Sequence, residues 1–176
     1  LFGINFNAYF LLLTRKFKQL FKIEEIRVYL GVIAVFTTLI AFNVRGCFGS
    51  LRESFHHSLF QVASIITTTG FSTVDFNQWP AFSKLLLVLL MFIGACAGST
   101  GGGMKCSRIL LLGKSVKKEL MCLIHPRLVR VNKMDGQRVP HEVMRSINVF
   151  VVAYAFIFIL SLLIISLNCE DLVTCF

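Results

Sequence analysis

The feature that most constrains this chain is a set of four long stretches that contain no charged residue. They cover residues 28–44, 54–74, 85–104 and 146–169. Each is close to the ~20 residues that a helix needs to cross a bilayer. Only 15% of all residues are charged, against about 25% in soluble domains, and the mean hydropathy is +0.75. We therefore predict an all-α integral membrane protein.

The second stretch, residues 54–74, is too polar to face lipid as a span. Two histidines, a glutamine and several serines and threonines leave only residues 59–66 mostly apolar. Lys and Arg collect in cytoplasmic loops, and here they concentrate before residue 28 and between residues 105 and 145. If both basic blocks are cytoplasmic, the second stretch must enter and leave the membrane from one side. We predict a re-entrant pore loop, and the net charge of +9 then needs no nucleic-acid partner.

The pore loop is predicted to begin with a short helix over residues 54–66 and to continue into Thr-Thr-Thr-Gly at 67–70. Irregular backbone at membrane depth is tolerated only where it is buried or lines a water-filled cavity. Potassium filters use backbone carbonyls in this way, and a glycine allows the backbone to turn. From composition alone, a polar turn between two helices fits this short run equally well.

Glycines cluster a second time, over residues 94–103. They interrupt a helix that would otherwise run over residues 82–113, because each interior glycine costs about 1 kcal/mol relative to alanine. A hinge or an unwound loop inside the membrane is one prediction. The pair Gly94 and Gly98 also forms a Gly-x-x-x-Gly pattern, which is typical of close helix packing in membranes.

Two motifs in order make the chain similar to a known family. Residues 67–80, Thr-Thr-Thr-Gly-Phe-Ser-Thr-Val-Asp followed by Trp79-Pro80, and residues 94–105, Gly-Ala-Cys-Ala-Gly-Ser-Thr-Gly-Gly-Gly-Met-Lys, carry the likeness. The chain resembles the Trk/Ktr/HKT superfamily of potassium transporters, specifically its bacterial TrkH/KtrB type. Residues 24–30 and 125–127 match as well.

The resemblance implies a potassium-channel-like fold of four repeats, each made of a helix, a re-entrant pore loop and a second helix. Only one repeat and part of the next fit here, so the chain is interpreted as a fragment. Residues 1–27 would end the preceding repeat, 28–113 would be the third repeat, 114–146 a cytoplasmic linker, and 147–176 the truncated start of the fourth. Within the third repeat we expect an outer helix at 28–44, a pore helix at 54–66, a filter at 67–71 and the interrupted inner helix at 82–113.

The resemblance also implies residue roles. Potassium would bind at the filter, above all at Thr68 and Thr69, and a gate loop would obstruct the pore beneath it. Asp75 is expected at the outer mouth, where it attracts cations, fixes the filter strand by hydrogen bonds, or caps a turn. The expected filter residues are Thr67, Thr68, Thr69, Gly70 and Phe71, and the expected gate-loop residues are Gly98, Ser99, Thr100, Gly101, Gly102, Gly103 and Lys105.

The implied function is potassium uptake across the bacterial inner membrane by a multi-pass, non-enzymatic protein. Potassium is the expected ion, and no organic cofactor is expected in this chain. Expected partners are membrane lipid, a second copy in a homodimer, and a cytoplasmic nucleotide-binding regulatory subunit of the TrkA/KtrA kind. The alternative from the residues is a non-transporting membrane scaffold or receptor whose glycines pack helices.

Overall fold

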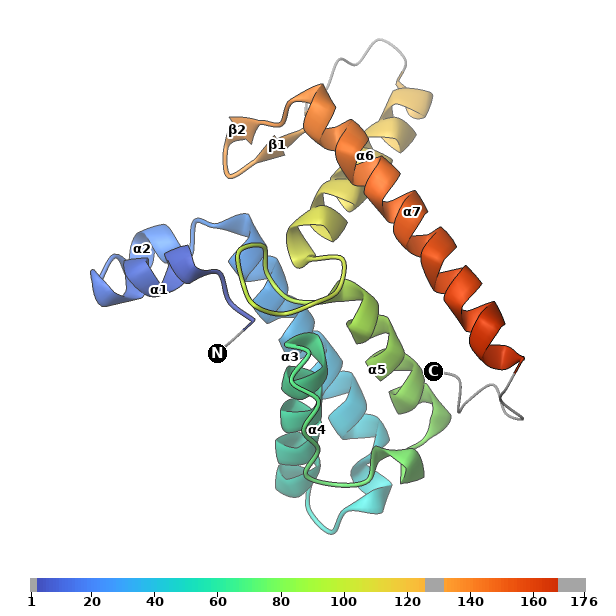
Figure 1. Ribbon diagram of the computed structural model, residues 1–176. Helices are drawn as coiled ribbons and strands as arrows, with labels where there is room; N and C mark the ends of the chain where they lie inside the picture. The colour runs from blue at the N-terminus through green and yellow to red at the C-terminus, as the bar shows by residue number, and fades with distance from the viewer. Residues whose placement is uncertain (1–2, 126–131, 168–176) are drawn as a thin grey trace.

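Helices dominate the chain in the computed structural model, which describes residues 3–125 and 132–167. Two short 3₁₀ helices, Arg45–Cys47 and Phe76–Gln78, and one antiparallel hairpin complete the described part (Figure 1). The helices are α1 (Phe6–Leu13), α2 (Phe17–Leu20), α3 (Glu24–Asn43), α4 (Leu51–Ile66), α5 (Ala81–Ile93), α6 (Cys106–Ile124) and α7 (His141–Ser166). The hairpin strands are β1 (Lys133–Met134) and β2 (Gln137–Arg138).

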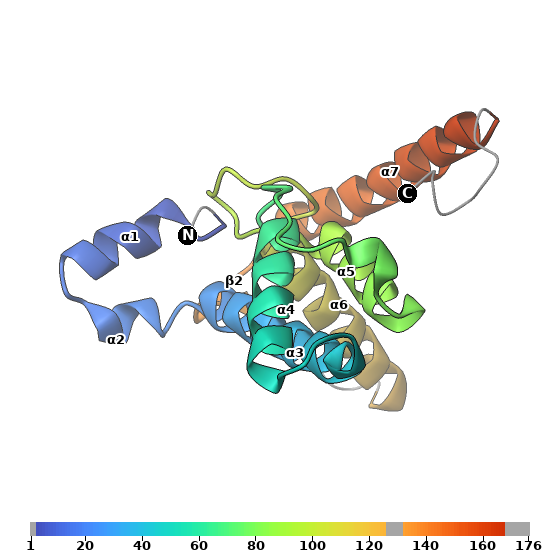
Figure 2. The same ribbon diagram turned by 90° about the horizontal axis from the view of Figure 1, so that it is seen from below.

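The centre of the molecule is a bundle of α3, α4 and α5. Its apolar core includes Ile40 of α3, Val62 and Ile66 of α4, and Leu90 of α5, none of which has exposed surface. Seen along the bundle, α1 and α2 project to one side and α7 to the other (Figure 2). The bundle is therefore the scaffold on which the remaining segments are placed.

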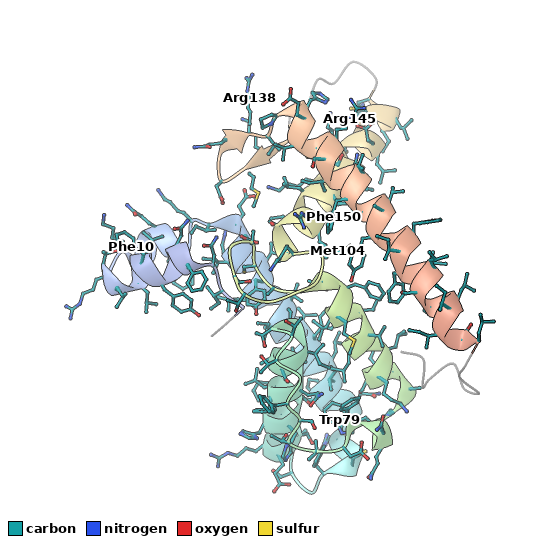
Figure 3. All side chains as sticks on the ribbon, in the orientation of Figure 1. Phe10, Trp79, Met104, Arg138, Arg145 and Phe150 are labelled. Atoms are coloured by element: carbon teal, nitrogen blue, oxygen red, sulfur yellow. The ribbon has the colours of Figure 1, made fainter. Side chains whose placement is uncertain are left out.

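The segment between α3 and α5 enters and leaves at the same end of the bundle. Helix α4 runs back alongside α3, and after Ile66 the chain returns along α4 to the 3₁₀ helix Phe76–Gln78 (Figure 1). Trp79 lies at this end of the molecule, which we call the turn end, whereas Arg138 and Arg145 lie at the opposite, basic end (Figure 3). The predicted order of helix, re-entrant loop and helix is what the structure shows.

Three helices begin earlier than charge alone predicts. Helix α3 begins at Glu24 instead of residue 28, because Glu24 and Glu25 form its first turn, where acidic side chains complement the helix dipole. Helix α4 begins at Leu51 instead of residue 54. Its N-cap is Ser50, whose Oγ accepts the N–H of Arg52 at 3.2 Å. Helix α7 begins at His141 instead of residue 147, directly after Pro140.

The expected cytoplasmic linker, residues 114–146, is mostly regular structure. Helix α6 continues past Gly113 to Ile124, because one glycine is too weak a break when strong helix formers follow it. The hairpin and the first turns of α7 occupy the rest of its described part. Residues 126–131 lie outside the described part, as do residues 168–176, where the approach to a fourth pore helix is predicted.

Two described helices are long and apolar enough to cross a membrane. They are α3 and α7, and α5 is a shorter apolar helix. The apolar window of α7 has no buried residue, so its surface is free to meet lipid or other protein. The predicted span at 85–104 is not one helix, since α5 ends at Ile93 and the glycine-rich segment follows.

Candidate functional site: a filter strand and a gate loop

The end of α4 holds the start of the filter strand, residues 67–71. The last carbonyls of a helix have no hydrogen-bond donors within the helix. Here N–H groups of the filter strand donate to two of them. The N–H of Thr68 donates to the Ile65 carbonyl at 3.0 Å, and that of Thr69 donates to the Ser64 carbonyl at 2.9 Å. The hydroxyl of Thr67 donates to the Ala63 carbonyl at 2.7 Å. The strand is therefore anchored to the pore helix through its backbone.

Two filter residues adopt left-handed backbone. Thr68 has a φ of 56° and Gly70 a φ of 78°. A β-branched residue such as Thr68 rarely adopts positive φ, and backbone strain of this kind clusters at functional sites. In a regular strand the carbonyls of successive residues point to opposite sides. Left-handed residues at every second position remove this alternation. This allows neighbouring carbonyls to point to one side, as an ion filter requires.

The far end of the filter strand is also held. The hydroxyl of Ser64, a nearly buried residue of α4, donates to the carbonyl of Phe71 at 2.5 Å. Farther along, Nδ1 of His57 lies 2.9 Å from Oγ1 of Thr73. The side of the strand away from α4 is exposed from Thr68 onward. The filter strand is therefore anchored to α4 on one side, while residues from Thr68 to Thr73 remain exposed.

The expected gate-loop residues belong to a glycine-rich segment, residues 94–105, which we call the gate loop from here on. It connects α5 to α6, and its two ends, at Gly94 and Gly102–Gly103, approach closely to form a neck. A Cβ at Gly94 would lie 2.5 Å from the carbonyl oxygen of Gly102, so only glycine allows this approach. Gly94 also has φ 65° and ψ −168°, which non-glycine residues essentially never adopt. The N–H of Cys106 donates to the Ala95 carbonyl at 2.9 Å and closes the loop at its base. The predicted interruption is thus a defined loop.

The gate loop touches the filter strand directly. The N–H of Gly102 donates to Oγ1 of Thr68 at 2.9 Å. A Cβ at Gly101 would lie 3.3 Å from the carbonyl oxygen of Thr67, so the loop backbone passes close to the start of the filter. Inside the loop, Nζ of Lys105 donates to the carbonyls of Ser99, at 3.3 Å, and Gly101. The two predicted motifs, 34 residues apart at this contact, form one site.

The Gly-x-x-x-Gly interpretation does not fit this geometry. Gly94 is the C-cap that follows the last residue of α5, and Gly98 lies in the loop with a φ of 69°. Neither residue belongs to a helix, so the pair cannot form a helix-packing face. Gly98 instead faces the side chain of Asn5, and its carbonyl accepts the N–H of Phe6 at 3.3 Å.

Asp75 caps a turn at the turn end of the molecule. Its Oδ1 accepts the N–H of Asn77 at 3.0 Å and thereby caps the 3₁₀ helix Phe76–Gln78. Of the roles considered for Asp75, this geometry is the capping role.

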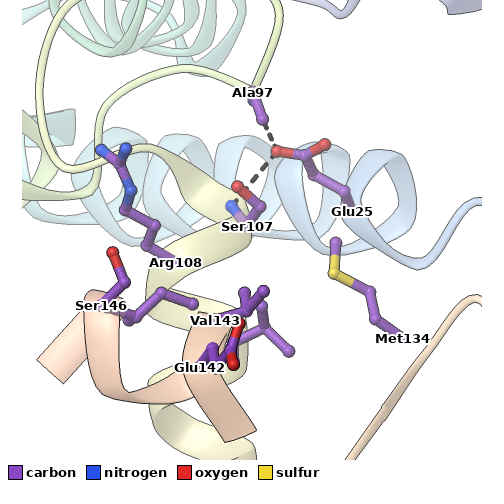
Figure 4. Close-up of a pocket in the computed structure, with 10 residues that line it drawn as sticks. Glu25, Ala97, Ser107, Arg108, Met134, Glu142, Val143 and Ser146 are labelled. Carbon is purple, nitrogen blue, oxygen red and sulfur yellow. Dashed lines mark hydrogen bonds between the residues drawn. The ribbon is translucent and has the colours of Figure 1, made fainter. Parts of the chain in front are cut away.

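A residue in contact with this site that the sequence prediction missed is Glu25. Its carboxylate lies behind the gate loop, where Oε1 accepts N–H groups from Ala97 at 2.6 Å and Ser107 at 3.1 Å (Figure 4). Glu25 is only 4% exposed. The sequence signal was slight, since an acidic residue in the first turn of a helix is ordinary.

Comparisons with known proteins agree with this architecture. The family model for TrkH, described as a cation transport protein, matches residues 5–176. The chain belongs to the TrkH family. The Trk system potassium uptake protein TrkH of Escherichia coli K12 is 38% identical over 174 residues, which is 96% of this chain and 36% of that protein. Escherichia coli TrkG is 34% identical over 179 residues, 99% of this chain and 36% of that protein.

A solved structure gives the same result. The crystal structure of the potassium transporter TrkH from Vibrio parahaemolyticus superimposes with a TM-score of 0.88 at 34% identity, over 99% of this chain and 38% of that chain. The predicted all-α membrane fold with a pore-loop repeat is thereby confirmed, as is the family resemblance. The chain spans about a third of the length of the TrkH proteins that it matches.

Proposed function

We propose that this chain forms one repeat of a potassium uptake pore, with a selectivity filter of backbone carbonyls and a gate loop beneath it. The ion is held by the carbonyls of Thr68, Thr69 and Gly70, with Thr67 and Phe71 flanking them. The observation that best supports the proposal is the hydrogen bond between Gly102 and Thr68, because it joins the proposed gate loop to the proposed filter strand.

The physical logic follows from the anchoring of the strand. Carbonyls replace the hydration shell of an ion only if they are held in place without being consumed by other hydrogen bonds. The pore helix satisfies the filter N–H groups of Thr68 and Thr69, and the hydroxyl of Ser64 fixes Phe71. The left-handed residues Thr68 and Gly70 then leave carbonyls available on the open side of the strand.

The names of the relatives support potassium as the ion. The Escherichia coli and Vibrio parahaemolyticus proteins are named as potassium uptake proteins. We extend this activity to the parent of this chain, located in the bacterial inner membrane as a multi-pass protein that acts as a homodimer. A cytoplasmic nucleotide-binding subunit of the TrkA/KtrA kind would regulate it. These assignments rest on the family and not on contacts within this chain.

Uptake of potassium or rubidium by the full-length parent protein tests the proposal. The host cells lack their own potassium uptake systems, and the variant is Gly70→Asp. The control is Gly46→Asp, the same change at an exposed glycine of the turn end whose Cβ would meet open space and whose φ is not positive. We expect Gly70→Asp to abolish uptake with normal membrane insertion, and Gly46→Asp to retain it. Full uptake by Gly70→Asp would show that residues 67–71 do not form the filter, and would favour the alternative of a non-transporting scaffold.

A further inference from the structure

A buried carboxylate bridges the two ends of the gate loop. Glu25 belongs to α3, yet its Oε1 accepts N–H groups from Ala97, early in the loop, and from Ser107, just after it. Figure 4 shows these two bonds converging on a single oxygen atom. One side chain therefore links the two ends of the loop, in addition to the bond from Cys106 to Ala95 that closes its base.

The site favours a negatively charged acceptor. Glu25 lies in the first turn of α3, and Ser107 lies in the first turn of α6, so the positive ends of two helix dipoles meet at this carboxylate. Hydrogen bonds from backbone N–H groups to an ionised acceptor are roughly twice as strong as neutral ones. With Glu25 almost fully buried, water offers these N–H groups little alternative.

The residue before Glu25 is held from the basic end. Oδ1 of Asp135, in the turn of the hairpin, accepts the N–H of the neighbouring Glu24 at 2.8 Å. The Glu24 carboxylate pairs with Nζ of Lys114 on α6. The same Nζ donates to the carbonyl of Lys133 at 2.7 Å. The start of α3, which carries Glu25, is thus tied to α6 and to the hairpin through the neighbouring Glu24.

We propose that Glu25 is the positioning residue that keeps the gate loop in its obstructing place beneath the filter. It acts through the loop backbone and touches neither the ion nor the filter strand. The inference rests on the proposed function, because it assigns Glu25 a part in gating that pore. When the two bonds to Glu25 are absent, the loop leaves the filter more often, while the filter geometry is unchanged.

The test uses the full-length parent protein in liposomes, without its regulatory subunit. The variants are Glu25→Ala, which removes the acceptor, and Glu25→Gln, which keeps the size and an acceptor oxygen but removes the charge. Glu25 and Glu142 both line the pocket of about 580 Å³ drawn in Figure 4. The matched control is therefore Glu142→Gln, because Glu142 lies in the exposed first turn of α7. Single-channel recording gives the open probability and the unitary conductance, and hydrogen exchange of residues 94–107 gives loop opening directly.

We expect Glu25→Ala to raise the open probability and the exchange rate of the loop by about tenfold or more, since two charge-assisted bonds are lost. Glu25→Gln should show a smaller rise, and the unitary conductance and the potassium-to-sodium permeability ratio should not change. Unchanged open probability and exchange in Glu25→Ala would overturn the inference. So would a changed permeability ratio, which indicates general distortion. If the unsubstituted protein carried no potassium current, the proposed function would fail, and loop exchange alone would still decide the role of Glu25.

Discussion

Replacing Gly94 by alanine should open the gate loop at its neck. The backbone at Gly94 adopts φ 65° and ψ −168°, which costs about 1–3 kcal/mol for a residue with a Cβ. The new Cβ would lie 2.5 Å from the carbonyl oxygen of Gly102 and 3.0 Å from Cα of Gly103. These are backbone atoms that cannot rotate away, so overpacking adds about 1–3 kcal/mol. Together the two effects destabilise the closed neck by roughly 2–6 kcal/mol.

Hydrogen exchange in the full-length parent protein measures this effect locally. The N–H groups of Gly102, Met104 and Cys106 are all hydrogen-bonded in the closed loop, and they exchange when the loop opens. A destabilisation of 2 kcal/mol corresponds to exchange about thirtyfold faster. The control is Gly113→Ala, inside α6, where a Cβ meets open space and alanine should stabilise the helix by up to about 1 kcal/mol. Equal loop exchange in the two variants would show that a side chain at position 94 does not strain the closed neck.

Two further predictions concern the ends of the filter. Ser64→Ala removes the hydroxyl that donates to the Phe71 carbonyl, a bond worth about 0.5–1.5 kcal/mol. The potassium-to-sodium permeability ratio, measured from reversal potentials, should therefore fall several-fold. An unchanged ratio would contradict this role of Ser64. Asp75→Asn keeps an acceptor for the N–H of Asn77, whereas Asp75→Ala loses the cap at a cost of about 1 kcal/mol. The thermal unfolding midpoint should therefore fall only in the alanine variant, and uptake at low external potassium should be normal in the asparagine variant; slow uptake there would show that the charge matters.

The course of the chain through the fold could be predicted because polarity and charge encode it directly. A polar stretch at 54–74 between two apolar stretches, with basic residues beyond them, leaves a re-entrant loop as the consistent topology. The break after α5 also followed from composition, since five glycines within residues 94–103 cannot continue a helix without a large cost. These features are local, and a single sequence shows them.

Helix ends were predicted less well because charge was used as the boundary. At α4 a better signal was present: Ser50 followed three residues later by Glu53 is a capping-box pattern, and the helix begins directly after Ser50. The inner helix was predicted to end at Gly113, whereas α6 continues to Ile124. The first turn of α3 contains Glu24 and Glu25, whose charges were taken to exclude them from the helix.

The contacts that make the site could not be predicted, because they join distant residues. Thr68 meets Gly102 across 34 positions, and Glu25 meets Ala97 and Ser107 across 72 and 82 positions. Glu25 carries no special pattern, since it is a glutamate in an ordinary first turn that accepts two backbone N–H groups. Only the packing of α3 beside the gate loop reveals that they act together.

We propose that the carbonyls of Thr68, Thr69 and Gly70 bind the transported ion. The most direct test is a crystal structure of the full-length parent protein grown in rubidium, with data collected at the rubidium absorption edge. We expect anomalous peaks on the open side of the filter strand, in contact with these carbonyls, and their loss when sodium replaces rubidium. Rubidium peaks elsewhere in the protein, with none along residues 67–71, would contradict the assignment of this strand as the filter.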